Sequence, residues 1–190
     1  METSSSNKKT LYVVGSIALL LLLVINVILV IQNRDLKQRL EEFAAQRTPN
    51  ILKVGDEVPS AVITMLDGQR KELSYSDSNK KYLLFLFNTT CGSCERNLPT
   101  WESIAASKQN GTYDILALSI FDEEKTRAFV SEKKMNLPVG LADTSFVKSY
   151  KIIGVPHTVV IDGNGTVQKI WSGTLKPENI QEIMNLLSAS

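Results

Sequence analysis

The first feature of the sequence is an uninterrupted apolar run near the N-terminus. Residues 11–31 contain no charged side chain and a single amide, Asn26. At about 1.5 Å per helical residue, the run predicts a helix of roughly 31 Å, enough to cross the hydrocarbon core of a bilayer. A buried helix in so small a protein is rarely apolar on every face. We therefore expect one transmembrane helix over residues 11–31.

A cleaved signal peptide is the alternative interpretation of this run. Signal peptides have a shorter apolar region and small residues at the cleavage site, whereas this run ends in Val-Ile-Gln-Asn-Arg. We therefore expect an uncleaved signal anchor. Basic residues flank the run on both sides, so charge does not set its orientation. A short N-terminus stays inside more easily than it crosses, which predicts a cytoplasmic segment over residues 1–10 and an extracytoplasmic C-terminal part.

Helix-forming residues follow the apolar run. Over residues 34–47 the apolar side chains Leu36, Leu40, Phe43 and Ala44 recur on one face. Thr48-Pro49-Asn50 ends this pattern. The sequence predicts a helical stalk within a linker over residues 32–50, and pairing of the stalk with another chain stays open.

From residue 51 onward, short apolar runs alternate with helical patterns, separated by turn signals such as Asp67-Gly68 and Asn110-Gly111. The order predicts an α/β domain over residues 51–190, with a central mixed sheet and helices on both faces. We expect strands over 61–66, 70–73, 81–88, 112–121, 155–161 and 166–172, and helices over 91–108, 122–135 and 177–187.

Composition narrows the function classes. The chain has 21 Lys and Arg residues against 20 Asp and Glu residues. No basic run with interleaved aromatic residues is present in the sequence, and such runs are typical of nucleic-acid binders. We therefore expect no nucleic-acid partner.

The chemistry is indicated by the only two cysteines, which form the motif Cys91-Gly92-Ser93-Cys94. The motif comes directly after a predicted buried strand and at the start of a predicted helix. Unpaired amide groups and the helix dipole stabilise a thiolate at that position. The second thiol, one turn further, is placed to attack a mixed disulfide. The motif therefore predicts thiol–disulfide exchange.

Two structural interpretations of the cysteine pair compete with redox chemistry. A disulfide across three residues closes too small a loop to stabilise a fold efficiently. A structural zinc site needs four ligands, and the sequence offers only the two cysteines of this motif and one histidine. Both interpretations are weaker than redox chemistry, and we expect no metal and no cofactor at the site.

The segment from about residue 55 onward resembles the TlpA/ResA-like membrane-tethered thioredoxins. An apolar strand leads into the cysteine motif, Pro99 follows the second cysteine by five residues, and Gly-Val-Pro-His-Thr at 154–158 precedes Val-Val-Ile-Asp. The resemblance implies a thioredoxin-like fold, a cis Pro156 beside the nucleophilic sulfur, and a Val155 backbone that pairs with substrate. Gly92 and Ser93 shape the same site. A Thr directly before the cysteine motif, as Thr90 is here, also occurs in MauD-like accessory proteins, so a resemblance to that branch stays open.

Four positions depart from the family pattern. Thr90 replaces a Trp, Phe85 replaces a buried acid of thioredoxins, and Asn97 replaces a Glu, so the usual proton acceptors for Cys94 are absent. His157 stands where cytochrome-maturation members often have Glu. We expect its imidazole near the Cys91 sulfur, where a protonated ring would stabilise the thiolate; a solvent-facing role is the alternative.

Taken together, these features predict an extracytoplasmic thiol–disulfide oxidoreductase, acting as a protein-disulfide reductase through Cys91 and Cys94. Its implied partners are substrate proteins with disulfides or thiols and a membrane protein that delivers electrons. The alternative is a Cu(I)-binding metallochaperone with a thioredoxin fold, because two soft thiolates and His157 suit Cu(I). Trp101 and Trp171 are expected to be packing residues.

Overall fold

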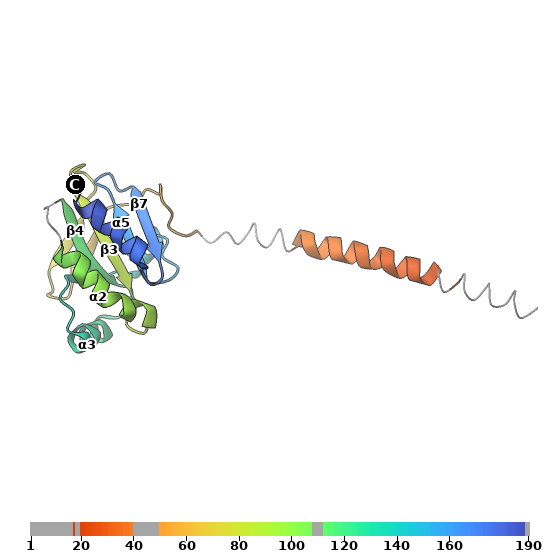
Figure 1. Cartoon of the computed structure of the whole chain (residues 1–190), viewed down its shortest axis with the longest axis horizontal. Coiled ribbons are helices and arrows are strands. Elements are labelled where there is room, and N and C mark those ends of the chain that lie inside the picture. The colour runs from red at the N-terminus through yellow and green to blue at the C-terminus, as the bar shows by residue number, and fades with distance from the viewer. Residues whose placement is uncertain (1–16, 18–19, 40–49, 108–111, 189–190) are drawn as a thin grey trace, which may run out of the picture. The chain divides into compact units, whose positions relative to one another are not determined.

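The computed structural model describes residues 17, 20–39, 50–107 and 112–188. It divides the chain into two units, Met1–Pro49 and Asn50–Ser190, and each is considered by itself (Figure 1). Residues 1–10, most of the apolar run before residue 20, and residues 40–49 of the predicted linker lie outside the described residues.

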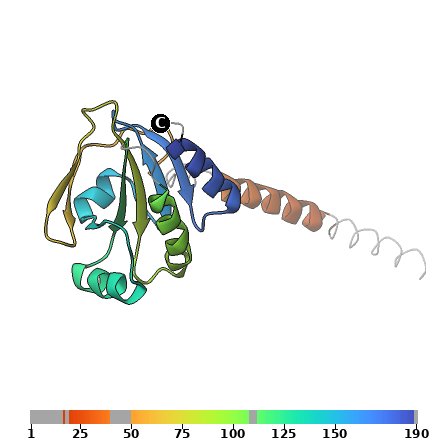
Figure 2. The same ribbon diagram turned by 60° about the vertical axis from the view of Figure 1, so that its left-hand side comes forward.

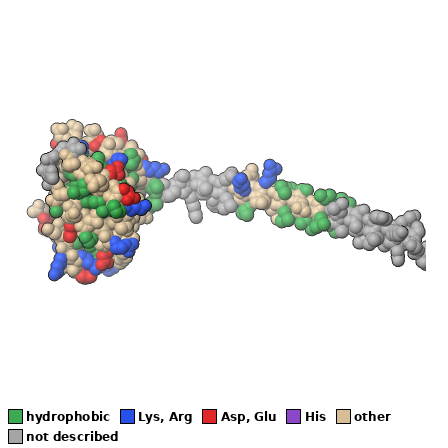
Figure 3. All heavy atoms as spheres, in the orientation of Figure 1, with side chains coloured by type: hydrophobic (Ala, Val, Ile, Leu, Met, Phe, Trp, Pro, Cys, Tyr) green, Lys and Arg blue, Asp and Glu red, His purple; other side chains and the backbone are tan. Residues whose placement is uncertain are grey.

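The described part of the first unit is a helix over residues 20–39. Every large apolar side chain from Leu20 to Ile31 is exposed within this unit, and hydrophobic side chains with Lys and Arg at one end are visible in Figure 3. Asn26 satisfies its amide locally by donating a 2.8 Å hydrogen bond to the Leu22 carbonyl. No helix formed by the described residues combines the length and the hydropathy needed to cross a membrane.

The second unit is built on a seven-stranded sheet in the order β2-β1-β5-β4-β3-β6-β7. Strands β5, β4 and β3 are parallel, and the two edges add antiparallel strands, so the sheet is mixed as expected. The strands are β1 (Ala61–Met65), β2 (Arg70–Leu73), β3 (Lys81–Phe87), β4 (Tyr113–Ser119), β5 (Val139–Leu141), β6 (His157–Ile161) and β7 (Val167–Ser172).

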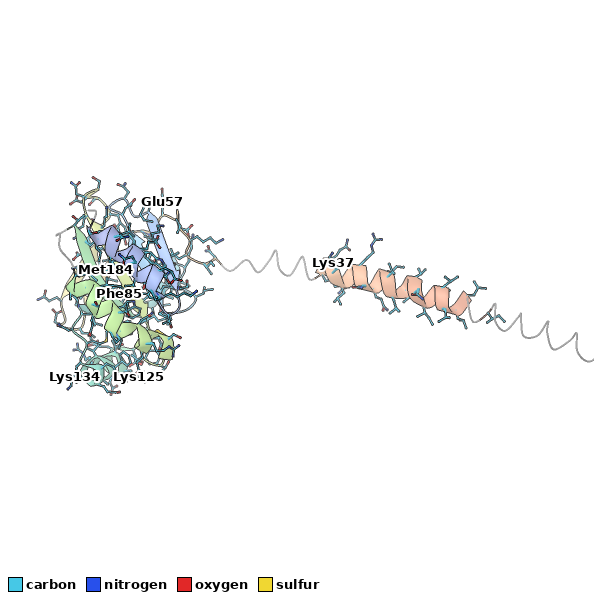
Figure 4. All side chains as sticks on the ribbon, viewed as in Figure 1. Lys37, Glu57, Phe85, Lys125, Lys134 and Met184 are labelled. Carbon is cyan, nitrogen blue, oxygen red and sulfur yellow. A yellow bond between two sulfur atoms is a disulfide. The ribbon has the colours of Figure 1, made fainter. Side chains whose placement is uncertain are left out.

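The continuous apolar run of β3 is explained by burial on both faces. Leu83, Phe85 and Phe87 pack into one core with the helices α2 (Gly92–Ala106), α3 (Glu123–Lys133) and α5 (Pro177–Ser188). Tyr82, Leu84 and Leu86 pack into a second core with α4 (Thr144–Ser149). Figures 1 and 2 show α2 and α5 side by side, and Figure 4 marks Phe85 in the middle of the unit. Helices therefore cover both faces of the sheet, as expected.

Local sequence signals explain the helix ends. Asp122 caps α3, because its carboxylate accepts a 2.9 Å hydrogen bond from the Lys125 amide. The same helix ends at Lys134, which has a positive φ of 53°, and Figure 4 labels Lys125 and Lys134 near its two ends. The predicted strand over 155–161 begins only at His157, because Pro156 has no amide hydrogen for the ladder. The expected turn at Asn110-Gly111 lies outside the described residues.

Two elements were not predicted. Strand β5 has three residues and helix α4 has six, so neither carries enough apolar positions to show a period. Strand β5 lies in the sheet between β4 and β1, and helix α4 supplies Phe146 to the second core.

Candidate redox site

The turn that follows β3 is shaped by Asn88. Its side-chain oxygen accepts hydrogen bonds from the Thr90 amide and the Thr90 hydroxyl, at 2.8 and 2.9 Å. Its carbonyl oxygen accepts a 3.2 Å hydrogen bond from the Cys91 amide. A side-chain turn of this kind carries the chain from the strand end to the helix start. It fixes the first cysteine at the C-terminal end of the central strand, and Thr90 is one of its components.

Cys91 and Cys94 are joined by a disulfide, with their Cα atoms 5.2 Å apart. Cys91 is the N-cap of α2, and its sulfur accepts a 3.1 Å contact from the Cys94 amide. Cys91 is half-buried, whereas Cys94 is fully buried. A substrate can therefore approach the first sulfur, while the second reacts only with its neighbour.

The two residues between the cysteines lie beneath a cation. Gly92 is exposed, and Ser93 Oγ accepts a 2.9 Å hydrogen bond from Arg96 Nη2. Arg96 Nη1 lies 3.7 Å from the position that a Cβ atom of Gly92 would occupy. A cation in the first turns of a helix is disfavoured by the dipole. Its placement here puts a positive charge beside the redox turn.

The backbone of Val155 faces the first sulfur. The Val155–Pro156 peptide bond is cis, as the family resemblance implied. The Val155 carbonyl oxygen lies 3.8 Å from Cys91 Sγ, and the Pro156 carbonyl accepts a 2.9 Å hydrogen bond from the Gly173 amide. The sheet thus brings residues 64 positions apart to one site.

In the described part of the chain, no hydrogen bond joins the His157 side chain to either cysteine. Its Nδ1 shares a 2.9 Å hydrogen bond with Ser172 Oγ, its cross-strand partner on β7. Side chains alternate along β6, and its neighbour Thr158 faces α2, where it contacts Trp101. The imidazole therefore lies on the opposite face from the helix that carries the sulfurs. Burial lowers its pKa from the usual 6.5, so the neutral ring is favoured.

Helix α2 contributes one buried polar residue whose contacts the sequence did not indicate. Asn97 is buried to 1% exposure. Its Nδ2 donates to the Gly173 carbonyl over 3.0 Å, and its Oδ1 accepts from the Leu175 amide over 2.9 Å. The signal was present, because Asn97 occupies the apolar face that Cys94, Leu98 and Trp101 define at helical spacing. Pro99 lies inside the same helix, as expected.

Phe85 stands at the position where thioredoxins have a buried acid, and it packs against α2. Its ring stacks on Trp101 with centroids 5.1 Å apart. Trp101 is fully buried and its indole N–H donates a 3.1 Å hydrogen bond to Thr158 Oγ1. Trp171 is half-buried and donates to Glu182 over 3.2 Å. Both tryptophans are packing residues, as expected.

The ligand set of the copper alternative is not assembled. No group of three or more His, Cys, Asp or Glu side chains converges among the described residues. Cys91 and Cys94 are paired with each other, and His157 is held by Ser172 on the other face of the sheet. The geometry instead presents one accessible and one buried sulfur, which suits thiol–disulfide exchange.

Comparison with known proteins agrees with this chemistry. Residues 53–187 match the family model described as Redoxin. The chain belongs to the Redoxin family. The match spans all seven strands of the sheet, and it includes both cysteines and the cis peptide.

Two relatives indicate the activity, and one solved structure indicates the fold. The chain is 24% identical over 147 residues to the thiol-disulfide oxidoreductase ResA of Halalkalibacterium halodurans, covering 76% of this chain and 82% of the relative. It is 26% identical over 135 residues to ResA of Bacillus subtilis, with 70% and 75% covered. A thiol:disulfide interchange protein of the thioredoxin family from Chlorobium tepidum matches with a TM-score of 0.58 at 18% identity, covering 71% of this chain and 97% of that one.

These comparisons confirm three predictions. The fold is thioredoxin-like, and the resemblance to ResA-like proteins holds across the second unit. The protein is a thiol–disulfide oxidoreductase whose redox pair is Cys91 and Cys94.

Proposed function

We propose that this oxidoreductase is a protein-disulfide reductase in which Cys91 is the nucleophile and Cys94 the resolving thiol. One observation carries the assignment: Cys91 is accessible at the helix N-cap and its sulfur accepts the Cys94 amide, whereas Cys94 is fully buried. The amide and the helix dipole stabilise a thiolate on Cys91 once the disulfide is reduced.

The reaction proceeds in two exchanges. The Cys91 thiolate attacks one sulfur of a substrate disulfide, a mixed disulfide forms, and the first substrate thiolate leaves. The Cys94 thiolate then attacks Cys91 Sγ, the intramolecular disulfide forms, and the second substrate thiolate leaves. Two electrons pass from the cysteine pair to the substrate, and the substrate thiolates take up protons from water.

The substrate chain docks along the cis peptide. Val155 belongs to no strand of the structure, and within the described residues its backbone has no hydrogen-bond partner; the disulfide-bonded sulfur of Cys91 lies 3.8 Å from its carbonyl oxygen. Unpaired backbone groups at the mouth of a site offer an extended peptide a pairing edge. Pro156 fixes the direction of that edge, and Gly92 and Ser93 leave room beside Cys91 because neither has a bulky side chain.

The reductase is anchored in a membrane by residues 11–31 and faces the extracytoplasmic side. Support comes from the uncharged run in the sequence and from the helix over residues 20–39, whose large apolar side chains up to Ile31 are exposed within its own unit. A helix that is apolar all round is stable in lipid rather than in water. Electrons then reach the oxidised pair from a membrane protein that carries reducing equivalents across the bilayer.

Two measurements on the full-length chain test these proposals. The reduction potential, obtained by glutathione equilibration of the detergent-solubilised protein, should lie below that of the extracytoplasmic compartment, and the reduced protein should reduce insulin. A potential above that of the compartment would assign an oxidase. In intact cells, a membrane-impermeant maleimide should label reduced Cys91, whereas labelling only after lysis contradicts the topology.

A further inference from the structure

The side-chain amide of Asn97 is buried in the core, where a polar group is stable only with hydrogen-bond partners. It lies in the apolar face of α2 with 1% of its surface exposed. An amide that is buried without partners destabilises the fold, because the hydrogen bonds it made to water are not replaced. Asn97 avoids this cost because both ends of its side chain are bonded to the segment that follows β7, at Gly173 and Leu175.

That segment in turn holds the cis peptide. Gly173, with a φ of +86°, donates its amide to the Pro156 carbonyl over 2.9 Å while its own carbonyl accepts from Asn97 over 3.0 Å. A continuous series of contacts thus runs from Asn97 on α2, through Gly173, to Pro156. Pro156 is joined by the cis peptide bond to Val155, whose carbonyl faces Cys91. The other direct link is the 3.8 Å approach of the Val155 carbonyl to the sulfur itself.

We infer that Asn97 is a positioning residue for the reductase reaction. It locks the Gly173–Leu175 segment to the redox helix and so fixes the Val155–Pro156 backbone relative to the Cys91 sulfur. The inference rests on the proposed function, in which that backbone receives the polypeptide of the substrate. Among the described residues, no hydrogen bond joins the Asn97 side chain to either sulfur.

The residue type fits this role closely. The two partners are a carbonyl and an amide of the backbone, so the side chain must donate to one and accept from the other. The carboxamide of Asn does both without a charge. A carboxylate lacks the donor for Gly173, and an apolar residue of the same size leaves both backbone groups buried and unpaired.

The test compares two disulfides on the full-length reduced protein in detergent. A peptide disulfide needs the Val155 backbone for its alignment, whereas hydroxyethyl disulfide is too small to pair with it. For Asn97→Ala we expect the rate with the peptide to fall about tenfold, because small displacements of a docking edge are costly. The rate with hydroxyethyl disulfide should stay within about twofold of that of the unchanged protein.

Thr126→Val is the matched control, because Thr126 is also a buried polar residue that links a helix to a strand through Ser119. It should lower the unfolding temperature but leave the ratio of the two rates unchanged. Asn97→Ser also breaks both contacts through its shorter side chain, and it is assayed wherever Asn97→Ala gives no folded protein. Equal loss of both rates, or no loss of either, overturns the inference. Failure of the unchanged protein to reduce either disulfide would instead overturn the proposed function.

Discussion

The Cys94 amide nitrogen lies 3.1 Å from Cys91 Sγ, inside the ring that the disulfide closes. The same amide also lies 2.9 Å from the Cys91 carbonyl oxygen, so its hydrogen is shared between oxygen and sulfur. When the disulfide is reduced, this donor is already oriented toward the sulfur that must carry negative charge. The asymmetry of the pair therefore exists before any substrate arrives.

This asymmetry predicts opposite behaviour for the two cysteine variants. Cys94→Ser should accumulate a mixed disulfide between Cys91 and a substrate, because the resolving thiol is missing. Cys91→Ser should accumulate none, because Cys94 has no exposed surface. Non-reducing electrophoresis and mass spectrometry of the full-length variants with insulin measure both. A stronger adduct in Cys91→Ser would reverse the assigned roles.

Arg96 should bias the site toward anionic disulfides. Its guanidinium lies beside Gly92 and Ser93, the two residues between the cysteines. For Arg96→Gln, the rate with oxidised glutathione relative to the rate with dicationic cystamine should fall about threefold at low salt. The difference should shrink in 1 M salt, where charges are screened. Arg127→Gln, which removes an exposed arginine paired with Glu123 on α3, is the control and should leave the ratio unchanged.

The contact between Trp101 and Thr158 should contribute measurably to stability. Thr158→Val keeps the volume of the side chain but leaves the buried indole N–H without its 3.1 Å acceptor. The free energy of unfolding in urea should fall by about 1–3 kcal/mol. Thr64→Val, on an exposed position of β1, should change it by less than about 0.5 kcal/mol. Equal effects of the two substitutions would show that the indole hydrogen bond adds nothing.

His157 should make the domain sensitive to mild acid. Burial lowers its pKa below 6.5, so the unfolded chain binds a proton more readily than the folded one. Stability is therefore complete above about pH 6.5 and is lost as the pH falls from there toward the lower folded pKa. His157→Gln, which still reaches Ser172, should remove this part of the pH dependence in urea titrations at pH 7.5 and 5.5. An unchanged dependence would assign it to other groups.

The same variant separates His157 from the redox chemistry. Because the ring is neutral and lies on the far face of the sheet, His157→Gln should leave the reduction potential at pH 7 unchanged in glutathione equilibration. A shift of about 15 mV or more, which corresponds to roughly a threefold change in the equilibrium constant, would indicate coupling to the cysteines.

The sequence was informative where a pattern was long or a spacing was fixed. The six consecutive apolar residues 82–87 of β3 and the cysteine motif after them predicted this buried strand and the redox turn correctly. β5 and α4 were missed because three and six residues are too few for a period to appear. The position of β5 is set by tertiary pairing with β4 and β1, which no local pattern encodes.

The sequence predicted the redox chemistry of the site but not the hydrogen bonds of the residues around it. Proximity to Val155 in the sequence suggested that His157 would also face Cys91, but a shift of one residue along a strand moves a side chain to the other face. Asn97 was considered only as the absence of an acid. Its partners, Gly173 and Leu175, are 76 and 78 residues away, and no feature near Asn97 in the sequence points to them.

The central place of β3 has a consequence for how the protein survives repeated turnover. All seven of its residues pair with β4 and five of them also pair with β6, so its amides should exchange with deuterium only when the whole domain unfolds. The disulfide that opens and closes in each cycle begins at Cys91, four residues after the end of this strand. We therefore expect β3 to keep its hydrogen bonds while the cysteine pair is oxidised and reduced many times.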